Sequence, residues 1–337
     1  MDADRVRDLL AVLCPTTVVT SVRDGPRSYS NELWLTHTDE GDLLLRIPKR
    51  SADPEYLRGS IVASRMAAEA GVPVSRFRAF APSTAIGRPA VVQEFQRGER
   101  ATDLVERDPG AVPGLAAVLG HWVGALHTIR RPQFGRVLES GGSNDWRAVV
   151  RVRVTGKLSE IPREALRADA TVIREAFDNL LQATPNVGEA SLVHGDLYFD
   201  NLLVRDRRAV CLLDFEHARF YDRFAEFGKL NEFLFERFPD SEQPFMDAYW
   251  QHFPPEPDDV VRRALAVGLY ELASLAYFGR WQPDLVPTYW DRLQRWLTNR
   301  ESAPARCPSR STGSRDRVSP TMGDATDSKY DATDSKY

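Results

Sequence analysis

Three side chains near the middle of the sequence have the types and spacing that phosphoryl transfer needs. In the stretch 192–204, LVHGDLYFDNLLV, Asp196 and Asn201 lie in a polar loop between two short apolar runs. Another short run, residues 209–213, follows and delivers Asp214 just beyond its end. One carboxylate can orient an attacking hydroxyl and accept its proton, while an amide oxygen and a second carboxylate can hold Mg²⁺. The pattern therefore predicts a magnesium-dependent phosphotransferase.

The apolar patterns around these loops indicate how the fold would position them. Residues 31–36 and 43–47 predict a hairpin, residues 51–70 a helix stopped by Gly71, and residues 90–95 another strand. Further along the chain, helical spacing recurs over residues 114–128, 163–183, 225–235, 260–277 and 289–299. We therefore expect an α+β fold with a small β-rich lobe over residues 1–96 and a larger helical lobe over residues 97–300.

The sequence changes character after about residue 300. It becomes rich in Ser, Thr, Pro, Arg and Asp, and it ends in DATDSKY written twice. Such a segment buries too little apolar surface to offset the entropy lost on ordering it. We expect residues 301–337 to be a disordered tail and assign it no function.

The composition argues against several classes of protein. The chain is 42% hydrophobic and 27% charged, which is ordinary for a globular protein, and its net charge of −4 argues against a nucleic-acid partner. No uninterrupted apolar run approaches the ~18–20 residues of a membrane span. The N-terminus is acidic where a secretory signal would be basic. We expect a cytoplasmic protein with no membrane partner and no obligate protein partner.

The two central motifs resemble those of the aminoglycoside phosphotransferase and choline kinase-like superfamily, which is related to the protein kinases. The family's loop H-G-D-x-x-x-x-N is matched by residues 194–201, and its metal motif I/L-D-[FW] by residues 213–215. The resemblance implies a bilobal protein-kinase-like fold in which Asp196 is the catalytic base and Asn201 and Asp214 are metal ligands. It also implies a structural role for His194.

The resemblance extends to the segment after the metal motif and to the N-terminal lobe. Glu226 corresponds to the carboxylate that braces the catalytic loop. The turn that ends in Ser30 and Asn31 resembles the family's phosphate-covering turn, and Arg46 lies on the strand whose basic residue contacts nucleotide phosphates. The strand 91–95 resembles the hinge that binds a purine. The resemblance implies purine contacts from the Glu94 carbonyl and the Gln96 N–H, with ATP or possibly GTP and Mg²⁺ as cofactors.

One expected feature of the kinase fold is missing from the sequence. In kinases, a Glu on the N-lobe helix pairs with the phosphate-binding basic residue. Gly59 and Ser60 occupy the expected positions here, so the sequence leaves the partner of Arg46 open. Glu216, two residues after Asp214, is either an auxiliary metal or water ligand or a solvent-facing charge.

We expect the acceptor group to be a hydroxyl of a small molecule. Acidic side chains in the helical lobe would attract an acceptor molecule that carries positive charge. They are Asp240, Glu242, Asp247, Glu256, Asp258, Asp259, Glu271 and Asp284. We therefore expect an aminoglycoside or a related basic antibiotic as acceptor, which would make the protein an antibiotic-resistance kinase. A solvated acidic surface explains the same residues equally well. The alternatives are a metabolic kinase for a sugar, amino alcohol or homoserine-like substrate, and an inactive nucleotide-binding regulator.

Overall fold

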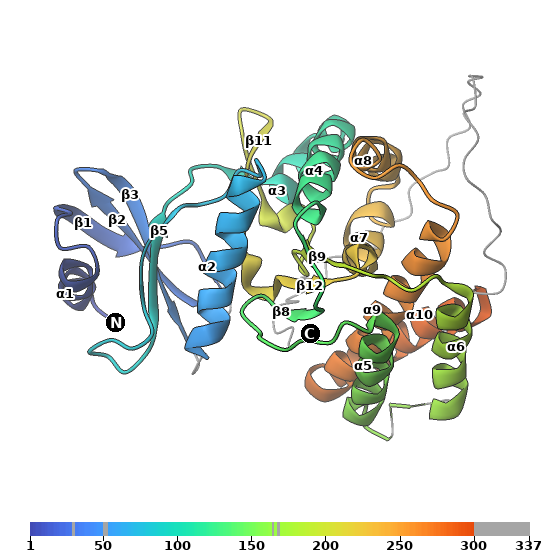
Figure 1. Cartoon of the computed structure of the whole chain (residues 1–337). Helices are drawn as coiled ribbons and strands as arrows, with labels where there is room; N and C mark the ends of the chain where they lie inside the picture. The colour runs from blue at the N-terminus through green and yellow to red at the C-terminus, as the bar shows by residue number, and fades with distance from the viewer. Residues whose placement is uncertain (29–30, 50–52, 164, 167–168, 300–337) are drawn as a thin grey trace.

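The computed structural model of the chain describes residues 1–28, 31–49, 53–163, 165–166 and 169–299. Ser30 and the predicted tail 301–337 lie outside these ranges. A β-sheet region at the N-terminus adjoins a larger region of helices (Figure 1), which confirms the predicted α+β, protein-kinase-like fold.

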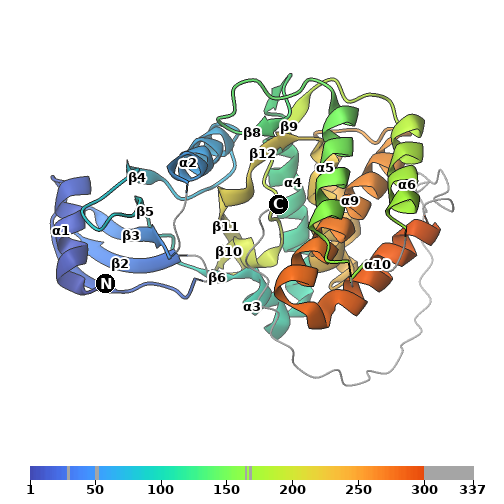
Figure 2. The ribbon, with the colours of Figure 1, turned by 90° about the horizontal axis from the view of Figure 1, so that it is seen from below.

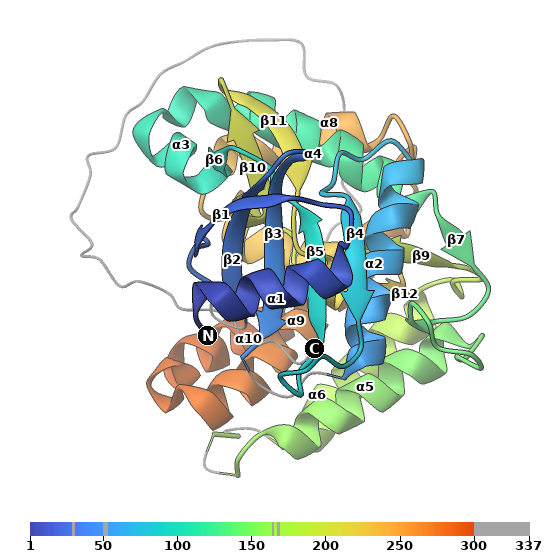
Figure 3. The ribbon, with the colours of Figure 1, turned by 90° about the vertical axis from the view of Figure 1, so that its left-hand side faces the viewer.

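The N-terminal sheet is antiparallel throughout, with strand order β1-β2-β3-β5-β4. Its strands are β1 (Val19–Asp24), β2 (Asn31–Thr38), β3 (Gly41–Pro48), β4 (Phe77–Ala81) and β5 (Ala90–Glu94). The helix α1 (Ala3–Leu13) crosses one face of the sheet (Figure 3), where Val6 and Leu10 pack with Leu45, Ile47 and Val92. This helix was not predicted from the sequence.

The helix α2 (Pro54–Glu69) connects the sheet region to the helical region (Figures 1 and 2). The Asp53 side chain caps its N-terminus, and Gly71, with a φ of +85°, follows its end as the sequence predicts. Its small residues Ala63 and Ala67 belong to the core of the helical region. The amide of Leu212 also donates to the carbonyl of Pro73 at 2.8 Å. The helix is therefore anchored beside the strand that precedes Asp214.

Two small sheets carry the motifs. In the first, β6 (Glu99–Arg100) pairs with β10 (Leu202–Arg205), which pairs with β11 (Arg208–Leu212). The second has the order β7-β9-β12-β8, formed by β7 (Arg130–Arg131), β9 (Ala190–Val193), β12 (Arg219–Tyr221) and β8 (Gly135–Arg136). Gly98 lets the connecting chain approach β10, because a methyl group there would lie 2.7 Å from the Val204 carbonyl oxygen.

The helical region is built around one large apolar core that includes Trp146, Phe227, Phe245 and Tyr249. Its helices are α3 (Ala101–Arg107), α4 (Val112–His127), α5 (Trp146–Glu160), α6 (Ala170–Ala183), α7 (Glu226–Leu230), α8 (Glu242–Tyr249), α9 (Asp259–Trp281) and α10 (Val286–Asn299). A π-helical turn, Asn231–Phe235, follows α7 directly. Together these two elements cover residues 226–235 of the segment predicted as one helix over residues 225–235.

One helical stretch, Pro109–His127, is long and apolar enough to cross a membrane by length and composition alone. In this fold its side chains Leu119, Val123 and Leu126 are fully buried in the large core. Packing inside the protein accounts for its apolar character.

One predicted helix begins later in the structure than the sequence suggests, and several helices were not predicted. The helix predicted over residues 163–183 begins only at Ala170, because the side chain of Asp169 accepts a hydrogen bond from the amide of Thr171 and caps the helix there. The helix α5 was not predicted. It begins after Asp145, whose side chain caps it through the amide of Ala148.

Candidate active site

The loop that follows β9 makes a tight turn at Gly195. This residue has a φ of +81°, and a methyl group on it would lie 2.5 Å from the carbonyl oxygen of His217. Only glycine fits both conditions without strain. The turn directs the chain into Asp196 and a short 3₁₀ turn, Phe199–Asn201, before β10 begins.

His194 joins this loop to the strand that ends before Asp214. Its Nε2 donates to the Leu213 carbonyl at 2.7 Å, and its Nδ1 accepts from the Asp196 amide at 3.3 Å. The ring is fully buried and meets Phe215 edge-on, with ring centres 4.7 Å apart. In this position His194 fixes the spacing of the two motifs.

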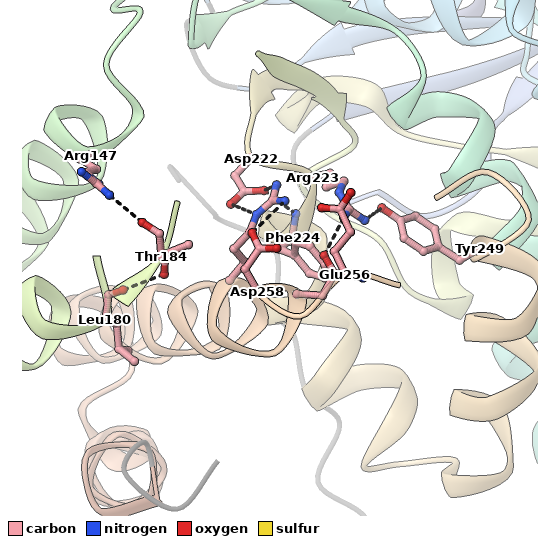
Figure 4. Close-up of polar contacts among 11 residues, drawn as sticks. Arg147, Leu180, Thr184, Asp222, Arg223, Phe224, Tyr249, Glu256 and Asp258 are labelled. Carbon is pink, nitrogen blue, oxygen red and sulfur yellow. Dashed lines mark hydrogen bonds and ion pairs between the residues drawn. The ribbon is translucent and has the colours of Figure 1, made fainter. Parts of the chain in front are cut away.

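Glu226, the first residue of α7, lies beneath the turn. Its Oε1 accepts a hydrogen bond from the Gly195 amide at 2.8 Å, and the side chain is almost completely buried. Burial raises the pKa of this carboxyl above its ordinary value. Asp222, a few residues earlier, forms an ion pair with Arg262 at 2.5 Å. Its side chain also accepts a hydrogen bond from the amide of Phe224 at 3.1 Å (Figure 4). The predicted bracing residue therefore lies against the backbone of the catalytic loop.

Both carboxylate oxygens of Asp196 are engaged. Lys229 forms an ion pair with Oδ1, and Nδ2 of Asn201 donates to Oδ2 at 3.0 Å. Burial raises the pKa of Asp196, but the Lys229 ammonium, together with His217 and His194, holds the pKa below its ordinary value. The carboxylate is thus kept charged and oriented, as a group that positions an attacking hydroxyl must be.

The predicted metal ligands lie on adjacent turns. The amide of Leu213 donates to the carbonyl of Asn201 at 2.8 Å, which ties the two turns together. Because Asn201 contacts Asp196 through Nδ2, its amide oxygen remains available as a ligand. Asp214 has a φ of +61°, an uncommon conformation for a residue other than glycine, and such conformations concentrate at functional sites. An amide oxygen and a carboxylate are ligands that suit Mg²⁺.

Glu216 is the partner of Arg46 that the sequence left open. The two side chains form an ion pair, and they are 12% and 13% exposed respectively. Asn31 donates to the same carboxylate at 3.3 Å, so Glu216 links β2 and β3 to the turn after Asp214. Glu216 is therefore not a solvent-facing charge. Burial raises its pKa, and the neighbouring Asp214 adds to this effect.

The remaining predicted nucleotide contacts lie at the end of β5. Glu94 is its last residue, and Gln96 follows where the chain leaves the sheet. Gln93, on the same strand, accepts from the Arg46 guanidinium at 3.5 Å. The strand register places Arg46 opposite Val91 and so brings the predicted phosphate-binding and purine-binding residues onto neighbouring strands.

Lys229 is a site residue that sequence reasoning missed. It comes from α7, 33 positions after Asp196, and its ammonium lies 4.4 Å from the ring centre of Tyr198 and 5.3 Å from that of Phe233. The chain is rich in arginine, and before the predicted tail lysine occurs only at positions 49, 157 and 229. This rarity was the one sequence signal that could have singled it out.

The comparisons with known proteins agree with this fold and these motifs. The model of the phosphotransferase enzyme family matches residues 21–265, so the chain belongs to that family. It is accordingly a small-molecule phosphotransferase that uses hydroxyl acceptors. Among curated protein sequences, none matches the chain.

Solved structures with the same fold share little sequence with this chain. A thermostable variant of aminoglycoside phosphotransferase APH(4)-Ia in a complex with AMP-PNP and hygromycin B is 15% identical, with a TM-score of 0.64 over 91% of this chain and 100% of that one. A Haemophilus somnus protein provisionally assigned as a fructosamine-3-kinase is 17% identical, with a TM-score of 0.64 over 88% and 96%. Macrolide 2′-phosphotransferase MphH from Brachybacterium faecium is 19% identical, with a TM-score of 0.55 over 92% and 99%. At these identities the likeness establishes the fold alone.

Proposed function

We propose that this protein is a Mg²⁺-dependent kinase that transfers the γ-phosphoryl group of ATP, or of GTP, to a hydroxyl of a small molecule. The observation that carries the proposal is the convergence of Asp196, Asn201 and Asp214 on two hydrogen-bonded turns. Arg46, a predicted phosphate-binding residue, is tied to the second of these turns through Glu216. The nucleotide-bound complex of the related APH(4)-Ia variant supports the choice of cofactor.

Each residue has a distinct task in this reaction. Asp196 orients the acceptor hydroxyl and takes its proton, and Arg46 steadies the nucleotide phosphates. Asn201 and Asp214 hold Mg²⁺, which neutralises charge on the phosphates when bound. The Glu94 carbonyl and the Gln96 N–H contact the purine. Transfer is direct, so no phosphorylated protein intermediate is needed.

For the acceptor we propose a basic antibiotic such as an aminoglycoside. The bound hygromycin B in the related structure supports this choice, as does the name of the macrolide phosphotransferase. Phosphorylation adds about −1.5 to −2 charges, which would offset the positive charge of such a drug.

The pairing of the acidic residues favours a second acceptor class. Asp259 pairs with Arg223 at 2.7 Å, and Glu271 pairs with Arg292 at 2.8 Å. Glu242 is also paired, with Arg263. Carboxylates already neutralised by arginine attract a polycation less strongly. A sugar, amino alcohol or homoserine-like acceptor of a metabolic kinase is therefore the alternative.

The test is nucleotide consumption with Mg²⁺ across aminoglycosides, other basic antibiotics, sugars and amino alcohols, with the Asp196→Asn variant as control. Turnover with a basic antibiotic that disappears in the variant would identify a resistance-type kinase. Turnover only with a sugar or an amino alcohol would assign the protein to metabolism. Nucleotide binding without turnover on any acceptor would contradict the proposal and indicate a regulator.

A further inference from the structure

A small cavity lies beside the catalytic loop, on the side of the helices α5, α7 and α9. Its volume is about 50 Å³, and its lining includes Trp146, Arg153, Gly195, Arg219 and Glu226. This is room for a few water molecules or one small polyatomic ion. The cavity therefore adjoins the glycine turn that positions Asp196, and none of the roles proposed above uses it.

Polar atoms without a partner point to an occupant of this cavity. Within the described part of the chain, the buried side-chain atoms that lack a hydrogen-bond partner include Trp146 Nε1, Arg219 Nε and Glu226 Oε2. Trp146 is 1% exposed and Glu226 is 2% exposed. Since a buried polar group is normally hydrogen-bonded, three such atoms from three elements around one cavity indicate a bound polar group.

The charges around the cavity give the sign of that group. Lys229 and Arg262 also line it, but each already forms an ion pair, with Asp196 and Asp222 respectively. By contrast, the described residues provide no ion pair for Arg153 or Arg219.

The two guanidinium groups without an ion pair both lie near the ring of Tyr221. Their central carbons lie 5.4 Å (Arg153) and 5.9 Å (Arg219) from the ring centre of Tyr221. Burial, reinforced by the positive charge of Arg153, lowers the pKa of Arg219 to about 9. A negative charge in the cavity would relieve this repulsion.

Glu226 is the one carboxylate that remains to be considered, since Asp222 is compensated by Arg262. Its Oε1 is used by the Gly195 amide, and its free Oε2 belongs to a carboxyl whose pKa burial raises. Glu226 also attracts Arg219, which leaves Arg153 as a cationic side chain of the lining without a carboxylate partner among the described residues. The lining is therefore compatible with an anionic occupant.

We propose that this cavity is a binding site for a small oxyanion, held by Arg153, Arg219 and the indole N–H of Trp146. A phosphate, sulfate or carboxylate group has the required size and charge, and guanidinium groups suit such oxygens. The oxyanion is either a free ion or the anionic end of a larger small molecule. Because Glu226 touches both the cavity and Gly195, the occupant would also support the catalytic turn.

The test is calorimetric titration of inorganic phosphate into the full chain with AMP-PNP and Mg²⁺ present at saturation, so that the proposed nucleotide site is filled. We expect saturable binding, weakened about tenfold or more by Arg153→Gln. The matched control is Arg151→Gln on the same helix, an exposed residue that pairs with Asp178 and does not line the cavity. This control should bind phosphate like the unmodified protein.

Two additions keep the test decisive. Trp146→Phe removes only the N–H and should also weaken phosphate binding, which covers the case that an arginine variant fails to fold. If AMP-PNP does not bind, the proposed function is in doubt, and the titration is repeated in an Arg46→Gln chain without nucleotide. Absence of phosphate binding, or binding equally strong in the Arg153→Gln and Trp146→Phe variants, would overturn the site.

A second probe distinguishes the source of the oxyanion. Glycerol 3-phosphate carries the same phosphate group on a hydroxylated molecule. If it competes with inorganic phosphate and its binding is weakened by Arg153→Gln, the cavity takes the anionic end of a larger molecule. If only inorganic phosphate binds, and with the same sensitivity to Arg153→Gln, the cavity takes the free ion.

Discussion

Lys229 and Asp196 form a buried ion pair at the centre of the site, although they come from different elements. The ammonium approaches Oδ1 of the carboxylate while the rings of Tyr198 and Phe233 flank it. A carboxylate held in its charged form is a weak base but a well-defined acceptor of a hydroxyl hydrogen bond. This suits phosphoryl transfer, in which positioning and electrostatics supply most of the catalysis.

The first prediction concerns Asp196 itself. Asp196→Asn should lower kcat by about 10²–10⁴-fold, the usual contribution of a general base. Nucleotide affinity should stay within a factor of about three, because Asp196 has no predicted contact with the nucleotide. Steady-state kinetics and calorimetry measure the two effects, and near-normal turnover would refute the role of Asp196.

The ion pair adds a stability effect that the double variant can isolate. Asp196→Asn leaves a buried ammonium without its counter-charge, a change that typically costs about 3–5 kcal/mol. Asp196→Asn combined with Lys229→Met should recover much of the unfolding free energy in urea titrations while activity stays lost. Equal instability of the single and double variants would mean that the ion pair has little effect on the fold.

Lys229 should also control the pH dependence of the reaction. Burial raises the pKa of Asp196, and Lys229, together with His217 and His194, opposes burial and holds the pKa below its ordinary value. Lys229→Met removes the strongest of these opposing charges, so the pKa rises and the carboxylate becomes protonated at higher pH. The acid limb of kcat/KM should move upward by about 1–3 pH units. Lys229→Arg keeps the positive charge and is the control; an unmoved limb in Lys229→Met would contradict the assignment.

The ion pair between Arg46 and Glu216 should govern nucleotide affinity. Glu216→Gln removes the charge that holds the guanidinium in place, so we expect the KM for ATP to rise about tenfold with a smaller change in kcat. Glu40→Gln is the matched control, because Glu40 pairs with Arg78 in the same lobe at an exposed position. An unchanged KM in Glu216→Gln would mean that Arg46 does not need this anchor.

Asp214 allows metal binding to be separated from folding. Asparagine tolerates the positive φ of this position, so Asp214→Asn should leave the free energy of unfolding within about 0.5 kcal/mol. Loss of the carboxylate should nevertheless abolish the Mg²⁺ dependence of nucleotide binding. Calorimetry with and without Mg²⁺ checks this. Asp214→Ala should in addition lose about 1–2 kcal/mol of stability, and retained Mg²⁺ dependence in either variant would exclude Asp214 as a ligand.

The parts of the fold that depend on local sequence could be predicted. The strands around the catalytic loop, the end of α2 before Gly71 and the order of the motifs follow from short patterns and glycine positions. The helix α5 could not, because residues 149–155, VVRVRVT, alternate apolar and polar residues as a strand does. Its capping by Asp145 and the burial of Trp146, Val150 and Val154 in the large core outweigh that local preference.

The site shows the same division. The glycine turn and the contact of His194 with the Asp196 amide are local, so the geometry of residues 194–201 could be predicted from the sequence. The partners Glu216 and Lys229 depend on contacts across 170 and 33 positions. No pattern in a single sequence specifies such long-range pairs, so the anchor of Arg46 emerged only from the fold.

The ion pair between Glu216 and Arg46 also affects the release of the nucleotide product. It joins the strand that carries Arg46 to the turn that carries Asp214. If one lobe moves away from the other, this largely buried ion pair must therefore break. A nucleotide product held by Arg46 and Asp214 would then be released only after the ion pair breaks and the lobes separate.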